Sequence, residues 1–179
     1  GQTSAFHPAT RLDRDTFGVV LLAKNSHVHA CLNALHSAGG LEKTYHALTF
    51  GCPETPSGII DAPIARRTYP SLLREIRADG KPSRTAYTML ARRGDCALLA
   101  LHPLTGRTHQ LRLHCAYSGF PILGDPQYGS AASCAYSAVQ GFAGQMLCAV
   151  SLSFLHPVTG ERLTITAKQD VSLAQLRDL

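Results

Sequence analysis

The sequence of 179 residues is long enough for one domain with a substantial core and too short to argue for two, so we expect a single domain over residues 1–179. Its 17 Lys and Arg against 12 Asp and Glu give a basic excess that permits a polyanionic partner such as nucleic acid. The six cysteines form no CxxC pair, which argues against a zinc knuckle and for reduced thiols, and no window approaches about 18 consecutive apolar residues, which argues against a membrane span. We therefore expect a cytoplasmic protein.

The first informative segment is a cluster of charges followed by an apolar run. Arg11, Asp13, Arg14 and Asp15 lie within five residues and precede the run 19–23, which we interpret as a buried strand. Charged side chains buried beside a core strand lower stability unless they form ion pairs, so such charges are usually retained for a function. Composition alone favours a solvated turn with local ion pairs, and only the motifs described below argue for a functional site.

A helix and a strand are predicted after this segment. Ser26 is expected to cap a helix of about a dozen residues, which Gly39-Gly40 ends. The stretch 41–50 alternates between wetter and drier positions and predicts a strand, with Lys43 and Tyr45 on one side of it.

The segment 52–84 is rich in proline, glycine and basic residues. Short strands near 59–64 and 72–77, joined by turns, would make it a basic flap. Such a flap is either a solvated surface excursion or an arm that contacts nucleic acid. Its basic residues are Arg66, Arg67, Arg74, Arg77, Lys81 and Arg84.

The rest of the chain predicts a hairpin, a helix, a long loop, two strands and a terminal helix. The hairpin turns at Arg93-Gly94-Asp95, and Gly119 ends the helix. The expected ranges are 85–91 and 96–102 for the hairpin strands, 105–118 for the helix, 120–144 for the loop, 145–155 and 162–167 for the strands, and 171–179 for the terminal helix.

Three motifs along the chain combine polar residues and glycines in a specific order. They are RLDRDTFG at 11–18, KTYHA at 43–47 and TGRTHQLRLH at 105–114, the last followed by GFPILGDPQYG at 119–129. Together they resemble the pseudouridine synthases of the RluA class, which modify ribosomal and transfer RNA. The chain departs from that pattern at Thr10, where the family often has His or Asn, and at Phe17, where it often has Ser. The Lys-Pro-containing segment that precedes the first motif in the family is missing, so we expect the N-terminal part of the domain to be absent.

The resemblance implies a fold and an activity. The expected fold is α+β, with a curved, mixed and mostly antiparallel β-sheet, flanking helices and a central cleft. The expected activity is the isomerisation of specific uridines in ribosomal or transfer RNA to pseudouridine, by a monomer. This reaction requires no metal and no organic cofactor, because it has neither a redox step nor a group donor.

The resemblance also implies the roles of individual residues. Asp13 is the expected catalytic carboxylate, Tyr45 would stack on the uracil base and help to move a proton, and Arg107 would hold Asp13 in its ionised form. Arg11 is expected to fill the space that a flipped uridine leaves. We expect contacts with RNA from Arg11, Arg14, Lys43, Arg66, Arg67, His109, Gln110 and Arg112.

Other interpretations of the same residues are weighed against these roles. His109 and His114 are expected to be hydrogen-bonded helix histidines or phosphate contacts rather than metal ligands, because the HExxH pattern is absent. Asp125 could be a second acid, but a turn-stabilising role before Pro126 fits better. An aspartyl phosphatase needs a strand before the Asp and a Thr four residues after it, where Phe17 stands here. The remaining alternative is an RNA-binding module of the same fold that has lost catalysis.

Overall fold

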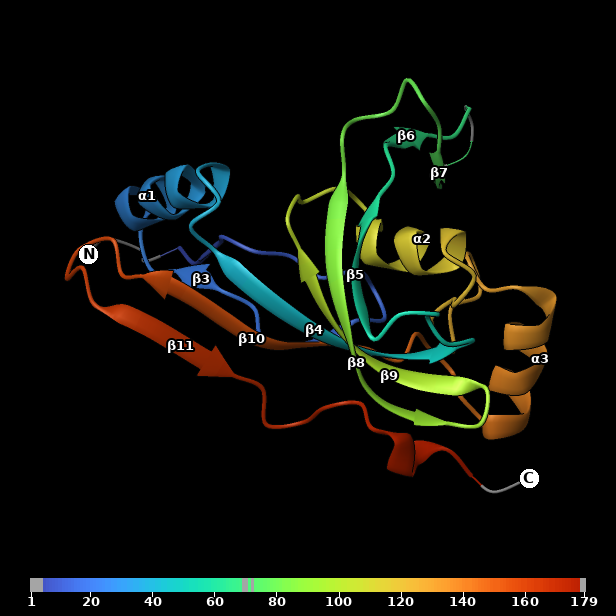
Figure 1. Ribbon diagram of the computed structural model, residues 1–179. Helices are drawn as coiled ribbons and strands as arrows, with labels where there is room; N and C mark the ends of the chain where they lie inside the picture. The colour runs from blue at the N-terminus through green and yellow to red at the C-terminus, as the bar shows by residue number, and fades with distance from the viewer. Residues whose placement is uncertain (1–4, 69–70, 72, 178–179) are drawn as a thin grey trace.

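The computed structural model describes residues 5–68, 71 and 73–177. Its main feature is a strongly twisted sheet in which seven strands of the described residues pair (Figure 1). All neighbouring strands are antiparallel except β2, which pairs in parallel with β10. The α+β fold with a mixed, mostly antiparallel sheet is therefore confirmed. In spatial order the strands are β11 (Arg162–Thr166), β10 (Leu147–Leu155), β4 (Glu42–Phe50), β9 (Cys96–Pro103), β8 (Arg84–Arg93) and β5 (Ser57–Asp61), with β2 (Phe17–Gly18) beside β10.

Two helices cover the face of the sheet that carries Lys43 and Tyr45. The helix α1 (Ser26–Ser37) buries Leu32 against Leu152 and Phe154 of β10. The helix α2 (Gln110–Tyr117) contributes to a cluster with the apolar residues of β4 and β9, and Figure 1 shows both helices on the same side of the strands. The functional motifs therefore meet on one face.

The opposite face is covered by a third helix and the end of the chain. Leu48 points away from the α2 side, because side chains alternate along a strand, and it lies in a cluster with Cys148 and Val171. The helix α3 (Ala131–Gln140) adds Tyr136 to this cluster, and the single 3₁₀ turn η1 (Leu173–Gln175) follows Val171.

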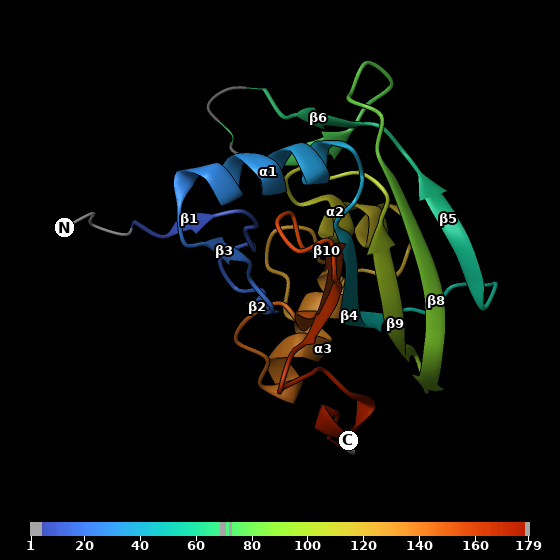
Figure 2. The same ribbon diagram turned by 90° about the vertical axis from the view of Figure 1, so that its left-hand side faces the viewer.

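Two small ribbons lie outside the main sheet. The strands β1 (His7–Pro8) and β3 (Leu22–Ala23) pair antiparallel beside α1, as Figure 2 shows. The strands β6 (Ile64–Arg66) and β7 (Arg74–Ile76) form a second antiparallel ribbon, which extends beyond α2 (Figure 1). This ribbon lies within the segment 52–84, and from here on the name basic flap refers to the ribbon alone.

Several predicted elements are confirmed and four are corrected. The helix after Asn25, the strand over 42–50, the hairpin and the last two strands form where expected, although the N-cap is Asn25, one residue before Ser26. The run 19–23 is not one buried strand: Val20 and Leu22 are 45% and 50% exposed, and only β3 forms there. The expected strand at 72–77 is β7, and its Leu72 lies outside the described residues.

The other corrections concern the helices. The helix predicted from residue 105 begins only at Gln110, since His109 has a left-handed backbone conformation with φ of 57°. The expected loop 120–144 contains α3, whose N-cap Ser130 accepts a hydrogen bond from the Ser133 N–H. The terminal helix is reduced to η1, and residues 178–179 lie outside the described part of the chain.

Candidate active site

The loop that carries Asp13 is held against the sheet by hydrogen bonds of its own residues. The N–H of Thr16 donates to the carbonyl of Asp13, which closes a tight turn, and the Thr10 hydroxyl oxygen accepts from the Leu21 N–H. Buried Gln145 donates from Nε2 to the Thr16 hydroxyl. The Asp13 side chain is 27% exposed, so it is partly shielded but still open to a substrate.

A buried arginine joins Asp13 to a second carboxylate. Arg112 donates from Nε and Nη2 to the two oxygens of Asp125, at 2.6 and 2.8 Å, and from Nη1 to Asp13 at 3.4 Å. Its Nη2 also donates to Gln127 at 2.7 Å. The side chains of Arg112 and Asp125 are only 6% and 1% exposed, so this two-pronged ion pair is shielded from water. Asp125 therefore fixes the guanidinium that faces Asp13.

The charges of this buried pair are stabilised by its hydrogen bonds. Burial alone would raise the pKa of Asp125, but the bonds from Arg112 and from the backbone N–H groups of Gln127 and Tyr128 outweigh burial and lower the pKa. Burial likewise opposes the charge of Arg112, and its bonds to Asp125 and Asp13 raise its pKa. These backbone bonds confirm that Asp125 stabilises the turn that it starts.

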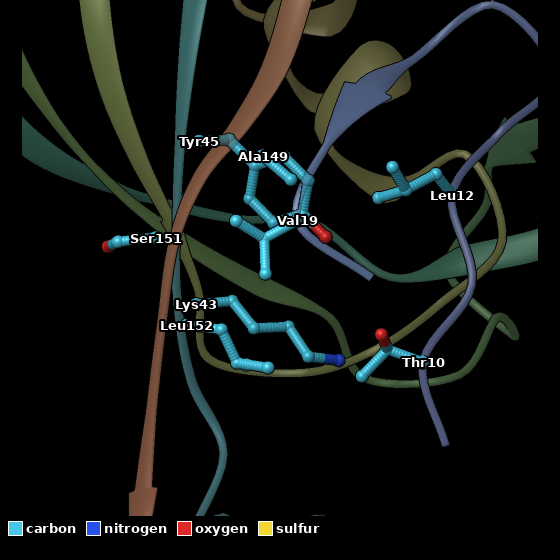
Figure 3. Close-up of a pocket in the computed structure, with 8 residues that line it drawn as sticks. All are labelled: Thr10, Leu12, Val19, Lys43, Tyr45, Ala149, Ser151 and Leu152. Atoms are coloured by element: carbon cyan, nitrogen blue, oxygen red, sulfur yellow. The ribbon is translucent and has the colours of Figure 1, made fainter. Parts of the chain in front are cut away.

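Tyr45 lines a small pocket beside the loop that carries Asp13. The pocket is lined by residues of the Asp13 loop, β4 and β10, and in Figure 3 Tyr45 and Lys43 extend from β4 toward the loop that holds Thr10 and Leu12. Burial first, and then the negative charge of Asp13, raise the pKa of Tyr45 to about 12. The phenol is therefore protonated at neutral pH.

Lys43 enters the pocket two residues before Tyr45 on the same strand. Its ammonium donates to Nε2 of His36 on α1 at 3.0 Å. Burial lowers the pKa of Lys43, and burial together with the charge of Lys43 lowers the pKa of His36. The contact of Lys43 with RNA stays a prediction. Because Lys43 lines the pocket, RNA would have to enter the pocket to reach it.

The tyrosine of the GDPQYG motif connects three parts of the site. Tyr128 Oη lies 2.8 Å from Nδ1 of His109 and accepts a hydrogen bond from the Arg74 N–H at 2.9 Å. The Arg112 guanidinium carbon lies 5.1 Å from the centre of the Tyr128 ring, within cation–π distance. Burial lowers the pKa of His109, and the negative charge of Asp13 acts in the opposite direction without reversing that shift.

The structure corrects the predicted role of Arg107. Within the described residues Arg107 has no ion pair with Asp13: its Nε donates to the Pro82 carbonyl at 3.3 Å, and the guanidinium beside Asp13 belongs to Arg112. The physical reason is that α2 begins after Arg107, so this residue lies on an exposed loop and not on the helix face that points at Asp13.

Two residues predicted to contact RNA are buried and fully engaged. Gln110 is 4% exposed; its Oε1 accepts from the Thr105 hydroxyl and the Arg107 N–H, while its Nε2 donates to the Arg84 carbonyl and the Thr85 hydroxyl. Arg112 is committed to Asp125 and Asp13. Neither is placed to bind phosphate, so both shape the site from inside.

The remaining predicted residues keep their expected surroundings. His114 is a hydrogen-bonded helix histidine as expected: Nδ1 faces the Thr85 hydroxyl and Nε2 the Ala62 carbonyl. The arginines predicted to contact RNA lie on the surface, near the Asp13 loop or on the basic flap, and these are Arg11, Arg14, Arg66 and Arg67.

The sequence prediction missed Tyr128 and Gln127 as residues of the site. Both lie in the quoted GDPQYG motif, so the signal was present, but only the contacts of Asp125 with Arg112 reveal what the motif does. Within residues 5–68, 71 and 73–177, no group of three or more His, Cys, Asp or Glu side chains could hold a metal ion. No helix of that same part of the chain is long and apolar enough to cross a bilayer.

Comparison with known proteins identifies relatives of this chain. A family model described as RNA pseudouridylate synthase matches residues 1–117. The chain is 34% identical over 165 residues to ribosomal large subunit pseudouridine synthase C of Vibrio cholerae, covering 92% of this chain and 52% of that protein. It is 35% identical to the uncharacterized RNA pseudouridine synthase YjbO of Bacillus subtilis, covering 96% and 59%. The chain thus spans little more than half the length of these curated relatives.

A solved structure shows the same fold. Human RNA pseudouridylate synthase domain containing 1 superposes with a TM-score of 0.80 at 27% identity, over 94% of this chain and 71% of that one. The match extends beyond residue 117, so it includes parts of the fold that the family model leaves out.

Proposed function

The chain belongs to the RNA pseudouridylate synthase family, and from this premise we propose that it isomerises uridine in RNA to pseudouridine with Asp13 as the catalytic carboxylate. One observation carries the proposal: the Asp13 carboxylate accepts a hydrogen bond from the buried Arg112 guanidinium, on a loop whose Thr10 and Leu12 line the same pocket as Tyr45. A partly shielded carboxylate and an aromatic ring at one site are what the reaction needs.

The reaction breaks the N1–C1′ bond of uridine, rotates the uracil and joins its C5 to C1′, after which C5 loses its proton and the freed N1 is protonated from the solvent. Asp13 would act on the sugar, either by attacking C1′ or by taking a proton from the sugar ring, and the hydrogen bond from Arg112 would hold its carboxylate in place for either route. Tyr45 would hold the detached base by stacking and act in its protonated form, since its pKa of about 12 leaves little phenolate at neutral pH.

RNA binding in this proposal uses the exposed arginines. The target nucleotide must leave its stack at a cost of a few kcal/mol, and Arg11, two residues before Asp13, would fill the space it leaves. Arg14, Arg66 and Arg67 would contact phosphates, with Lys43 and His109 closer to the base. A relative named as a synthase of the large ribosomal subunit makes ribosomal RNA the first substrate to test, and transfer RNA the second.

The test uses RNA that carries tritium at C5 of uridine, because joining C5 to the sugar expels that hydrogen. Release of tritium by the wild-type protein is the expected result. Salt-dependent RNA binding without release from any cellular RNA would contradict the proposal and favour the RNA-binding module without catalysis. We also propose a cytoplasmic, monomeric protein, and light scattering in solution tests the oligomeric state.

A further inference from the structure

We propose that Tyr128 is a positioning residue that fixes the basic flap, His109 and Arg112 relative to Asp13. The inference rests on the proposed function and extends it to a residue that has no contact with Asp13 itself. It starts from the side chain of Tyr128, whose ring and hydroxyl contact different partners.

The hydroxyl of Tyr128 is bound from two sides. The backbone N–H of Arg74 can only donate, so Oη accepts this bond, and the phenolic proton is then available for Nδ1 of His109. A histidine whose Nδ1 accepts a hydrogen bond is neutral and carries its proton on Nε2. We assign the phenol as the donor in this bond, so that Tyr128 selects one tautomer of His109 and ties it to β7, which belongs to the basic flap.

The backbone at His109 indicates that this arrangement is enforced. Among the described residues, His109 is the only non-glycine residue with a positive φ, at 57°, a conformation that is strained for residues other than glycine. It precedes α2 directly, and its ring meets the Tyr128 ring edge to face at 5.6 Å. The tertiary contacts of Tyr128 hold the imidazole in this position.

The ring of Tyr128 extends the arrangement to Asp13. It lies under the Arg112 guanidinium at 5.1 Å, while the Tyr128 N–H donates to Asp125, the other partner of Arg112. Arg112 in turn donates to Asp13. Movement of Tyr128 would therefore displace both His109 and the guanidinium that orients the catalytic carboxylate.

The pH dependence that follows involves all charged groups around His109. These are Asp13, Arg112, Arg74 and Asp125, together with the hydroxyl of Tyr128. The bond from Tyr128 exists only while Nδ1 is unprotonated, so it favours neutral His109 beyond what burial does. Removal of that hydroxyl should raise the pKa of His109 and move the acidic limb of the pH–rate profile to higher pH.

The test compares Tyr128→Phe with Tyr117→Phe. Tyr128→Phe keeps the ring over Arg112 and loses both hydroxyl bonds, whereas Tyr117 is 61% exposed at the end of α2 and serves as the matched control. At saturating RNA, we expect the single-turnover rate of tritium release to fall about tenfold in Tyr128→Phe, the factor that corresponds to loss of the bond to His109. Its acidic limb should move upward, measured from about pH 5 to 8. Tyr117→Phe should match the wild type in both.

A second variant keeps the test decisive if Tyr128→Phe folds poorly. His109→Asn retains a residue that tolerates positive φ but cannot reach Tyr128 in the same way. It should lose rate to a similar extent, and the double variant should be no slower than the slower single variant within about twofold, since the two residues act as a unit.

Two results would overturn the inference with an active wild type. One is a Tyr128→Phe protein with wild-type rate and pH profile. The other is a Tyr128→Phe protein that binds RNA more weakly but releases tritium at the wild-type rate when RNA is saturating. Tyr128 would then only hold the basic flap in place for RNA binding. A wild-type protein that releases no tritium would instead refute the proposed function, so the two failures are distinct.

Discussion

Replacing Arg112 by methionine should lower both the stability of the protein and its catalytic rate. The change leaves the Asp125 carboxylate, 1% exposed, without its cationic partner, and removal of one partner of a buried ion pair costs about 3–5 kcal/mol of unfolding free energy. It also frees Asp13, and a catalytic group displaced by roughly 1 Å costs about 100-fold in rate. Arg112→Lys keeps the positive charge but cannot donate two parallel hydrogen bonds to Asp125, so we expect a smaller loss of unfolding free energy, about 1–3 kcal/mol.

Urea unfolding followed by circular dichroism gives the free energies, and tritium release gives the rates. Arg107→Met is the matched control for stability, because Arg107 is exposed and donates only to the Pro82 carbonyl, so its unfolding free energy should change by no more than about 0.5 kcal/mol. An Arg112→Met protein that unfolds at the wild-type urea concentration would refute the assignment. So would equal losses of stability in Arg107→Met and Arg112→Met.

Two further predictions concern RNA binding and pH. Arg66→Gln and Arg67→Gln should each lower the slope of log affinity against log salt by about 0.7–0.9, if each neutralises one phosphate, and unchanged slopes in filter binding would remove the flap from the RNA interface. Burial lowers the pKa of His114, so the unfolded chain binds a proton more readily and stability should fall as pH drops below about 6.5. Urea midpoints at two pH values measure this loss, and His114→Gln should flatten it; an equal pH dependence in both proteins would contradict the reasoning.

The sequence was most informative where local pattern and tertiary structure agree. The alternation over 41–50 and the hairpin at Gly94 predict β4, β8 and β9, because their burial and turn chemistry are local properties. The three motifs likewise predict that Asp13 and Tyr45 share a site, and in the structure Thr10 and Leu12 of the Asp13 loop line the same pocket as Tyr45.

The sequence was least informative where one side chain organises a loop. Gln110 binds the Thr105 hydroxyl and the Arg107 N–H, so the chain before it cannot form the predicted helical turn. This shift moves Arg107 to the surface and leaves Arg112 beside Asp13, a difference that motif order alone does not encode. The helix α3 was missed because its many Ser and Ala residues suggested a loop, whereas its caps, Ser130 and Gly141, mark its two ends.

The central claim, that Asp13 performs catalysis, is tested most directly by comparing Asp13→Asn with Asp15→Asn in tritium release. Both changes remove one negative charge from the same loop. Asp15 pairs with exposed Arg14, whereas Asp13 accepts a hydrogen bond from the buried Arg112 guanidinium. We predict that Asp13→Asn abolishes release while retaining RNA binding and fold, and that Asp15→Asn releases tritium like the wild type. Release by Asp13→Asn at the wild-type rate would contradict the account.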